Sequence, residues 1–425
     1  MYDKLRSPKF VFFIFFILVN IFSYVLVTNS GSLIGESSAI EFTSWYFVVP
    51  VLIMLVISYF FILCPVYIIF RKVYVRSIFP HGIPNDISKF IGIIVLSLQL
   101  SFILYFSLTG TFSANSTERA GSIGSAFWVF ISIDNLFLVY YALFRETNLF
   151  KYNLFFAVAS NVLRGWSSIF FIIIFLEFSR LYRLKRLKMY ILLLSSVLVI
   201  VLYPFIYFGK LILRAMTISG GDLSVGVDLV FTGLEKSADS VSFVTALSVS
   251  LEQVITRFQL LSNALAVYEV REYLNDKLVA GDIVPYWAES IYGIIFHKML
   301  NLSYGINLGE MMANIISSSP FDTSWNSNPS FLAWFFIEPS SSICYILFVL
   351  TLCAVSMFIC KLSSGTGLYL DLIWFSWLIY VLPGWNASLV LFVHAQIIFL
   401  FMIMIVFLLS RISLLKIARG CGDGV

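Results

Sequence analysis

Residues 154–188, LFFAVASNVLRGWSSIFFIIIFLEFSRLYRLKRLK, decide how this chain is threaded. If they formed one membrane helix, the basic cluster at residues 180–188 would lie on the opposite side from every other basic loop, against the positive-inside rule. A hairpin of two short or tilted helices, turning near residues 161–166, removes the conflict. It places Arg164 at an exterior apex and residues 181–188 as a basic helix facing anionic lipid headgroups in the cytoplasm.

The composition around this stretch is that of a membrane protein. Hydrophobic residues make up 60% of the chain and charged residues 12%, whereas a soluble domain carries about 25% charged residues. Helices of about 20 apolar residues satisfy their own backbone polar groups across a hydrocarbon core about 30 Å thick. We therefore expect an all-α polytopic membrane protein.

Working outward from the hairpin, apolar runs and basic loops predict about ten transmembrane helices, with a range of 10–12, and both termini in the cytoplasm. Residues 1–208 form an N-terminal transmembrane bundle that includes the hairpin, and residues 209–340 form a large helical extracytoplasmic loop domain. Residues 341–410 form the C-terminal transmembrane helices, and residues 411–425 a cytoplasmic tail. The predicted spans are residues 10–27, 45–70, 90–108, 126–144, the two halves of the hairpin, 190–208, 341–360, 368–381 and 389–409.

The loop domain is predicted to be a helical cap over the bundle. Apolar residues recur every three or four positions over residues 241–274, which indicates one long helix of about nine turns. A second helix is expected from Pro285 to about Leu300, and a third over residues 308–316. Residues 320–339 are predicted to form an irregular, aromatic-rich lip.

Arg164 is the strongest functional signal. An arginine at membrane depth is costly, so it usually faces a cavity or a partner and marks a functional site. The alternative is a structural role, in which Arg164 pairs with Asp134 or Glu177 or extends to the lipid headgroups.

Three further arginines, Arg214, Arg257 and Arg271, lie in the loop domain. The planar guanidinium donates bidentate, charge-assisted hydrogen bonds and stays protonated, which suits a diphosphate. Together with Arg164 they are predicted to form an exterior clamp for a diphosphate. Each is equally compatible with an ordinary solvated ion pair, and the available carboxylates are Glu252, Glu269 and Glu272.

Acid or base chemistry on a hydroxyl nucleophile would need a carboxylate or an imidazole. The candidates are Glu252, Asp322, Glu338 and His297, and we place Glu252 and Asp322 with Arg164 and Arg257 in the predicted catalytic set. The sequence has no His/Cys cluster for zinc and no glycine-rich phosphate loop. We therefore expect no metal and no cofactor.

The layout resembles that of Wzy-type oligosaccharide repeat-unit polymerases, relatives of the O-antigen ligases among polytopic glycosyltransferases with lipid-linked donors. SNVLRGW at residues 160–166 is similar to the Arg-Gly turn that these families place between two membrane segments. The large exterior loop with its arginines is the second similarity. The paired arginine-to-glycine motifs of some polymerases are not matched, because residues 214–226 and 271–281 miss the spacing. The loop also lacks the His-Asn pair of ligases, which favours a polymerase.

The resemblance implies an enzyme that polymerises undecaprenyl-diphosphate-linked repeat units of an O-antigen or similar surface polysaccharide. The nascent glycan would pass to an incoming repeat unit at the outer face of a bacterial inner membrane, with the active site facing the periplasm. Its partners would be the lipid-linked oligosaccharides, membrane lipids and a chain-length regulator, without nucleic acid. Two alternatives remain open: an O-antigen ligase, and a flippase or exporter of lipid-linked oligosaccharides.

Overall fold

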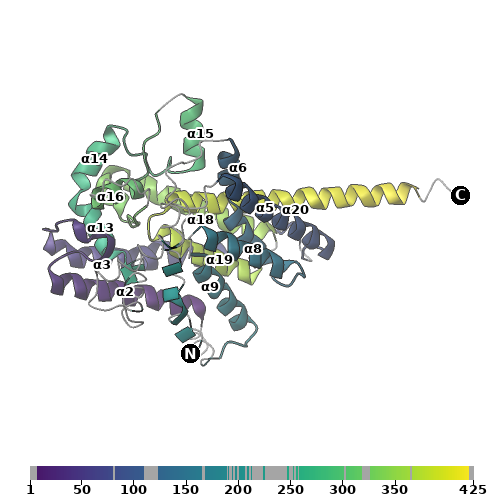
Figure 1. Cartoon of the computed structure of the whole chain (residues 1–425), viewed down its shortest axis with the longest axis horizontal. Coiled ribbons are helices and arrows are strands. Elements are labelled where there is room, and N and C mark those ends of the chain that lie inside the picture. The colour runs from purple at the N-terminus through teal and green to yellow at the C-terminus, as the bar shows by residue number, and fades with distance from the viewer. Residues whose placement is uncertain are drawn as a thin grey trace.

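The computed structural model describes most of the chain from residue 7 onward (Figure 1). The described residues are 7–79, 82–109, 123–164, 168–188, 190, 194, 197–198, 201–205, 208–209, 212, 224, 247, 252, 255–256, 258–300, 303–317, 326–363 and 366–420.

Within these residues the fold is helical, and its one β-type contact is the isolated bridge between Ile283 and Ile306. The all-α membrane fold class therefore stands at this level. Six described helices are long and apolar enough to cross a membrane, and a seventh, Gly367–Val381, is apolar but shorter. The six candidates are Pro8–Ala39, Trp45–Lys72, Asn85–Thr109, Gly124–Phe144, Pro339–Ser363 and Asn386–Arg411. The finer count of ten stays a prediction, because half of residues 189–208 lie outside the described part.

The α-helices are α2 (Pro8–Ser30), α3 (Val48–Ile57), α4 (Cys64–Lys72), α5 (Asn85–Thr109), α6 (Ile123–Ile131), α7 (Ile133–Phe144), α8 (Phe150–Leu163), α9 (Ser168–Arg183), α13 (Leu261–Glu269), α14 (Arg271–Val279), α15 (Ile291–Met299), α16 (Leu308–Ile316), α17 (Ala333–Ile337), α18 (Ser342–Ser363), α19 (Gly367–Ser376) and α20 (Asn386–Gly420). Shorter 3-10 turns are η1 (Gly35–Ala39), η2 (Trp45–Phe47) and η4 (Pro339–Ser341), and π-helical segments are η3 (Ser58–Leu63) and η5 (Trp377–Val381).

Helix α20 is a long helix that contacts several others in the bundle. It packs against α5, α7 and α18, and its 35 residues correspond to about 52 Å of helix. This length exceeds a hydrocarbon core of about 30 Å, and the C-terminal part of α20 projects beyond the other helices (Figure 1). The predicted span at residues 389–409 is therefore the inner part of a longer helix.

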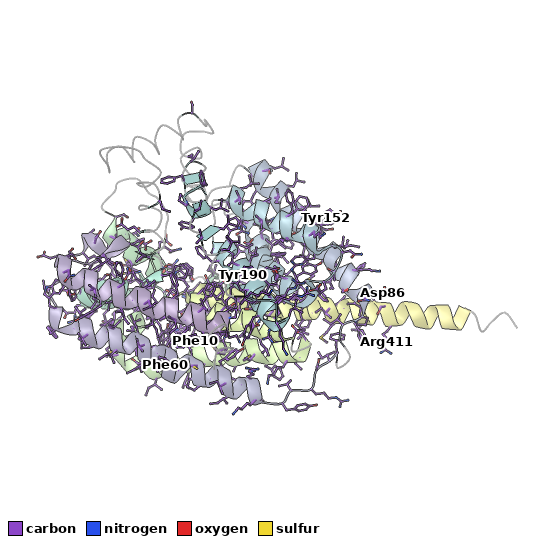
Figure 2. The ribbon with its side chains drawn as sticks, turned by 90° about the horizontal axis from the view of Figure 1, so that it is seen from below. Phe10, Phe60, Asp86, Tyr152, Tyr190 and Arg411 are labelled. Carbon is purple, nitrogen blue, oxygen red and sulfur yellow. The ribbon has the colours of Figure 1, made fainter. Side chains whose placement is uncertain are left out.

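The outer surface of the bundle is apolar. Phe10 and Phe60 project from the ribbon in Figure 2 and are 40% and 44% exposed. Aromatic rings also fill the interior, where Phe175 of α9 stacks on Phe375 of α19 with ring centroids 4.2 Å apart. Apolar side chains on both the lipid side and the inner side are expected of helices immersed in lipid, since no face has to meet water.

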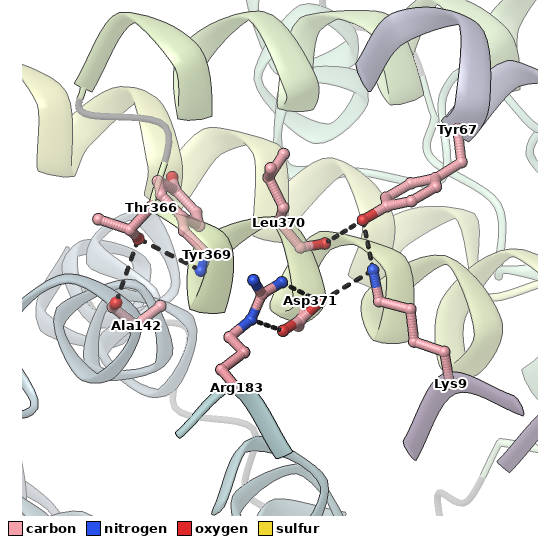
Figure 3. Close-up of polar contacts among 8 residues, drawn as sticks. All are labelled: Lys9, Tyr67, Ala142, Arg183, Thr366, Tyr369, Leu370 and Asp371. Carbon is pink, nitrogen blue, oxygen red and sulfur yellow. Dashed lines mark hydrogen bonds and ion pairs between the residues drawn. The ribbon is translucent and has the colours of Figure 1, made fainter. Parts of the chain in front are cut away.

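A buried carboxylate joins three helices at one end of the bundle (Figure 3). Asp371 of α19 is 4% exposed, and Arg183 of α9 binds it in bidentate fashion, with Nε–Oδ2 at 2.5 Å and Nη2–Oδ1 at 2.8 Å. Lys9 of α2 lies 2.8 Å from Oδ1. Gly367 makes room for this pair, because a Cβ there would lie 2.1 Å from Nη1 of Arg183. We call this end of the bundle, which holds Lys9, Arg183 and Asp371, the basic end.

Helices α8 and α9 lead away from one level of the bundle and back to it. Arg145 and Glu146, just before α8, pair with Glu177 and Arg180 near the end of α9, at 2.6 Å and 2.9 Å. With 14 and 16 residues, these helices are about 21 Å and 24 Å long. Residues 165–167, where the hairpin prediction places part of its turn, lie outside the described residues.

The long helix predicted for the loop domain is interrupted. Instead of one helix over residues 241–274, α13 ends at Glu269 and α14 begins at Arg271, because Val270 leaves helical geometry with φ −98° and ψ 15°. Helix α13 is also buried on all sides, since every residue from Leu261 to Val267 has its side chain inside. It packs against α2, α3 and α17.

Polar groups explain why α13 lies inside the fold. Asn20 of α2 accepts from the Leu260 amide at 2.8 Å, and Ser23 of α2 donates to Gln259 at 3.1 Å. Buried side-chain hydrogen bonds between helices fix a single packing when both partners are satisfied. The apolar spacing correctly predicted helix in this region. The polar residues between the apolar ones determine that the helix packs inside the bundle.

Of the other helix predictions for the loop domain, one is confirmed and one is shortened. Helix α16 covers Leu308–Ile316, which confirms the predicted third helix. The second begins at Ile291, because residues 285–290 form turns before α15. In the predicted lip, α17 is a short helix, and the Phe331 amide binds the Leu382 carbonyl at 2.8 Å.

We predict that Asp371→Asn lowers the free energy of unfolding by about 3–5 kcal/mol, because two cations at the basic end lose their buried carboxylate. The measurement is thermal unfolding of the purified protein in detergent. Glu146→Gln is the control: its side chain is 78% exposed and also binds an arginine, so its loss should cost less than about 1 kcal/mol. Equal losses for the two variants would contradict the role assigned to Asp371.

Candidate functional site

The candidate site is built around a break in the span Gly124–Phe144. Ser132 separates α6 from α7 and has φ 48° and ψ 56°, in the left-handed region. For a residue other than glycine this conformation costs of the order of 1 kcal/mol and is found where surrounding contacts impose it. Asn135 supports the break, since its amide nitrogen donates to the Ser132 hydroxyl at 3.0 Å.

Directly after the break, Asp134 binds the arginine singled out by the sequence. Nη2 of Arg164 lies 2.7 Å from Oδ1 of Asp134, and Nε donates to the Ser160 carbonyl at 3.1 Å. Asn161 donates to the same Oδ1 at 2.8 Å. The guanidinium also lies 4.9 Å from the centroid of the Phe102 ring. Three helices, α5, α7 and α8, thus hold one guanidinium.

This contact lies deeper than the predicted exterior apex. Asp134 is the midpoint of the candidate span Gly124–Phe144, and Arg164 is 8% exposed. The structural pairing of Arg164 with Asp134 that the sequence analysis left open is present. The Asp134 side chain is 28% exposed, so the partner carboxylate is more accessible than the arginine.

The break also releases a carbonyl, which a histidine binds. An α-helix would direct the Phe130 carbonyl to the N–H of residue 134, but here it lies 2.7 Å from Nε2 of His394 on α20. Since a carbonyl only accepts, Nε2 carries the proton and Nδ1 accepts from the Tyr292 hydroxyl at 2.5 Å. Through His394, the first turn of α15 is therefore linked to α20 and to the Phe130 carbonyl at the break.

A buried carboxyl joins the loop domain to the bundle. Glu289, in the turns before α15, accepts from the amide of Leu308 at 2.8 Å and from Nδ2 of Asn386 at 3.2 Å. The Tyr345 hydroxyl of α18 donates to the other side of Asn386 at 3.3 Å. Glu289 therefore contacts the first residues of both α16 and α20.

Burial changes the acidity of this carboxyl. Glu289 is 6% exposed, and loss of hydration raises its pKa to about 7, although hydrogen bonds from Leu308 and Asn386 oppose the shift. A carboxyl with a pKa near neutrality can accept or release a proton at physiological pH. Perturbed pKa values of this kind are enriched at functional sites.

The structure separates Arg271 from Arg164. Arg271 donates to the Tyr268 carbonyl at 2.7 Å, lies over the Tyr268 ring and pairs with Glu272 at 3.4 Å. Helix α14, which carries it, lies well away from α8 (Figure 1). Arg271 is therefore in the solvated ion pair that was the alternative to a clamp. Arg214, Arg257 and Asp322, also predicted site residues, lie outside the described residues.

The predicted acid and base candidates have ordinary surroundings. Glu252 is an exposed residue in helical geometry. Glu338 accepts from the Ser341 hydroxyl at 2.7 Å, and Nδ1 of His297 lies 2.8 Å from the Gly293 carbonyl of its own helix. Neither of these two contacts is with a residue of the candidate site.

Glu289 is the residue that the sequence analysis missed. It is the single Asp, Glu, Lys or Arg between Asp282 and Lys298, and an isolated charge in an apolar stretch is the signal that could have found it. The contact of His394 with a released carbonyl could not be anticipated without the break at Ser132.

Among the described residues, no group of three or more His, Cys, Asp or Glu side chains could hold a metal ion. Searches of protein-family models, curated proteins and solved structures found no match to this chain.

We predict that Glu289 makes stability depend on pH. Its pKa rises from 4.5 in the unfolded chain to about 7 in the folded state, so the folded state binds the proton more tightly. The free energy of unfolding should fall as pH rises from 4.5 to 7, by about 3 kcal/mol, and then stay lower. Thermal unfolding of the wild type and Glu289→Gln from pH 5 to pH 8 measures this. The variant should lose the slope; an unchanged slope would show that another group titrates.

Proposed function

We propose that this protein is a glycosyltransferase that polymerises lipid-diphosphate-linked oligosaccharides at the outer face of a bacterial inner membrane. The observation that carries the proposal is the Arg164–Asp134 contact at the broken span. Three helices hold this guanidinium as a fixed positive charge, and the proposal requires the diphosphate of the lipid-linked donor to enter the bundle to reach it. Similarity of residues 160–166 to the Arg-Gly turn of Wzy-type polymerases supports the same assignment.

In this reaction a sugar hydroxyl of the incoming repeat unit attacks the anomeric carbon of the nascent glycan. The bond to the lipid diphosphate breaks, and negative charge grows on the diphosphate as it leaves. Arg164 would stabilise that charge by preorganised electrostatics. The Asp134 side chain is 28% exposed, and in this proposal the anion would exchange with it.

The hydroxyl must lose a proton as it attacks, and Glu289 is the group suited to accept it. Its pKa of about 7 matches the operating pH of a general base. Glu289 is linked through Asn386 to the start of α20, and His394, which binds the broken span, lies about 12 Å further along the same helix. We assign the diphosphate to Arg164 and the sugars to the Glu289 region of the loop domain. Arg214, Arg257, Glu252 and Asp322 stay predictions for this site.

The test is the surface glycan ladder of cells that lack the gene and carry plasmid-borne variants. Arg164→Ala should reduce polymer about 10²–10³-fold, the usual cost of removing one electrostatic donor, and leave single repeats. Arg271→Ala is the matched control, because the same change removes an arginine bound to Tyr268 and Glu272; its ladder should be normal. Immunoblots of membranes must show both variants at wild-type level. A normal ladder with Arg164→Ala would refute the proposal.

A flippase is the second candidate, favoured by a specific observation. The span Gly124–Phe144 is interrupted at Ser132, and discontinuous helices near mid-membrane are typical of transporter binding sites. The location of undecaprenyl-diphosphate-linked single repeats distinguishes the two. Loss of a polymerase leaves them on the outer face and in singly capped lipid, whereas loss of a flippase leaves them on the cytoplasmic face.

A further inference from the structure

A groove at the basic end of the bundle has the form of a site for an anionic lipid. It has a volume of about 300 Å³ and lies between the end of α4, the following residues 73–75 and α18. Its walls include Phe70, Val73, Val75, Ala354 and Phe358, and its one charged lining residue is Lys361.

The walls are apolar because of helical spacing. Ala354, Phe358 and Lys361 are four and three residues apart, so they share one face of α18. Phe358 is 52% exposed and Val73 47% exposed. The groove therefore opens to the surroundings along the side of the bundle, where an acyl chain can enter it.

Hydrogen bonds hold the groove in shape. The amide of Ile78 donates to the Leu362 carbonyl at 2.9 Å, and the Ser77 hydroxyl donates to the same oxygen at 3.3 Å. Lys361 Nζ donates to the carbonyls of Arg71, at 3.1 Å, and Val73. The segment after α4 is thus tied to the end of α18 at several points, and contacts within the protein set the shape of the groove.

The charged residues on the two segments that line the groove have one sign. Arg71 and Lys72 form the last turn of α4 beside Lys361, and neither residues 45–79 nor residues 342–363 contain Asp or Glu. Lys361 uses two of its three N–H groups on carbonyls, and an ammonium has a third to donate. A phosphate beside Lys361 would meet cations and no carboxylate from these two segments, since Asp371 is already bound by Arg183 and Lys9.

We propose that this groove binds an anionic diacyl phospholipid of the inner leaflet, with one acyl chain along Ala354 and Phe358 and the phosphate at Lys361. The positive-inside rule places these basic residues on the cytoplasmic side, where anionic lipids attract them. The site is separate from the proposed polymerase chemistry and stands whether or not that proposal holds.

The experiment uses the full-length protein in vesicles that contain photoactivatable phosphatidylglycerol or phosphatidylcholine, with the diazirine in one acyl chain. Peptide mapping locates the crosslinks. Phosphatidylglycerol should label residues 70–75 and 354–358 about fivefold more than phosphatidylcholine, the effect of about one favourable charge contact. Lys361→Gln should reduce its labelling to the phosphatidylcholine level, and Ala354→Trp, which fills the groove without changing charge, should remove labelling by both lipids there.

Lys89→Gln is the control, because it removes one basic residue from outside this groove; its labelling should match the wild type. Equal labelling by the two lipids in the wild type, or unchanged labelling in both Lys361→Gln and Ala354→Trp, would overturn the proposal. Displacement of the label by polyprenyl phosphate but not by excess phosphatidylglycerol would overturn the diacyl assignment.

Discussion

A charge buried in this bundle has to find its partner within the protein, because lipid offers none. The cost of an unpaired ion in a low-dielectric medium is several kcal/mol even after relaxation. Two ion pairs in the bundle, those of Asp371 and Asp134, meet this requirement in different ways. At the basic end, Asp371 receives Arg183 and Lys9 together, so the cluster keeps one excess positive charge. At the broken span, Asp134 and Arg164 balance one another.

The two contacts differ in burial, and we assign a structural role to the first and a chemical role to the second. Asp371 is 4% exposed and joins α2, α9 and α19, so it acts as a fixed link. Asp134 belongs to a helix that is already interrupted, and its side chain is partly open. Removing the partner of a partly exposed charge costs less than removing the partner of a fully buried one. Under the proposed function, Arg164 would exchange Asp134 for the diphosphate.

The parts of the fold set by local pattern were predictable, and the parts set by distant polar contacts were not. Helix α16 has its predicted bounds because Asn307 caps it, accepting from the Glu310 amide at 2.8 Å. The long helix predicted over residues 241–274 was wrong because Val270 interrupts the described part of it. The spacing of apolar residues cannot reveal such a break. It also cannot reveal the hydrogen bond from the Leu260 amide to Asn20, which holds the residues before α13 inside the bundle.

The site shows the same division. Arg164 and its partner Asp134 could be found from sequence, since charges in apolar spans are few and must pair. The isolated charge of Glu289 is visible in the sequence, but its raised pKa is not, because that pKa depends on burial by segments far away in the chain, including Asn386 of α20. The two residues also differ in kind. An arginine keeps its charge at any physiological pH, whereas Glu289 exchanges a proton near neutrality. Under the proposed transfer, Arg164 would stabilise the leaving anion and Glu289 would accept the proton, and α20 contacts both the helix of Asp134 and, through Asn386, Glu289.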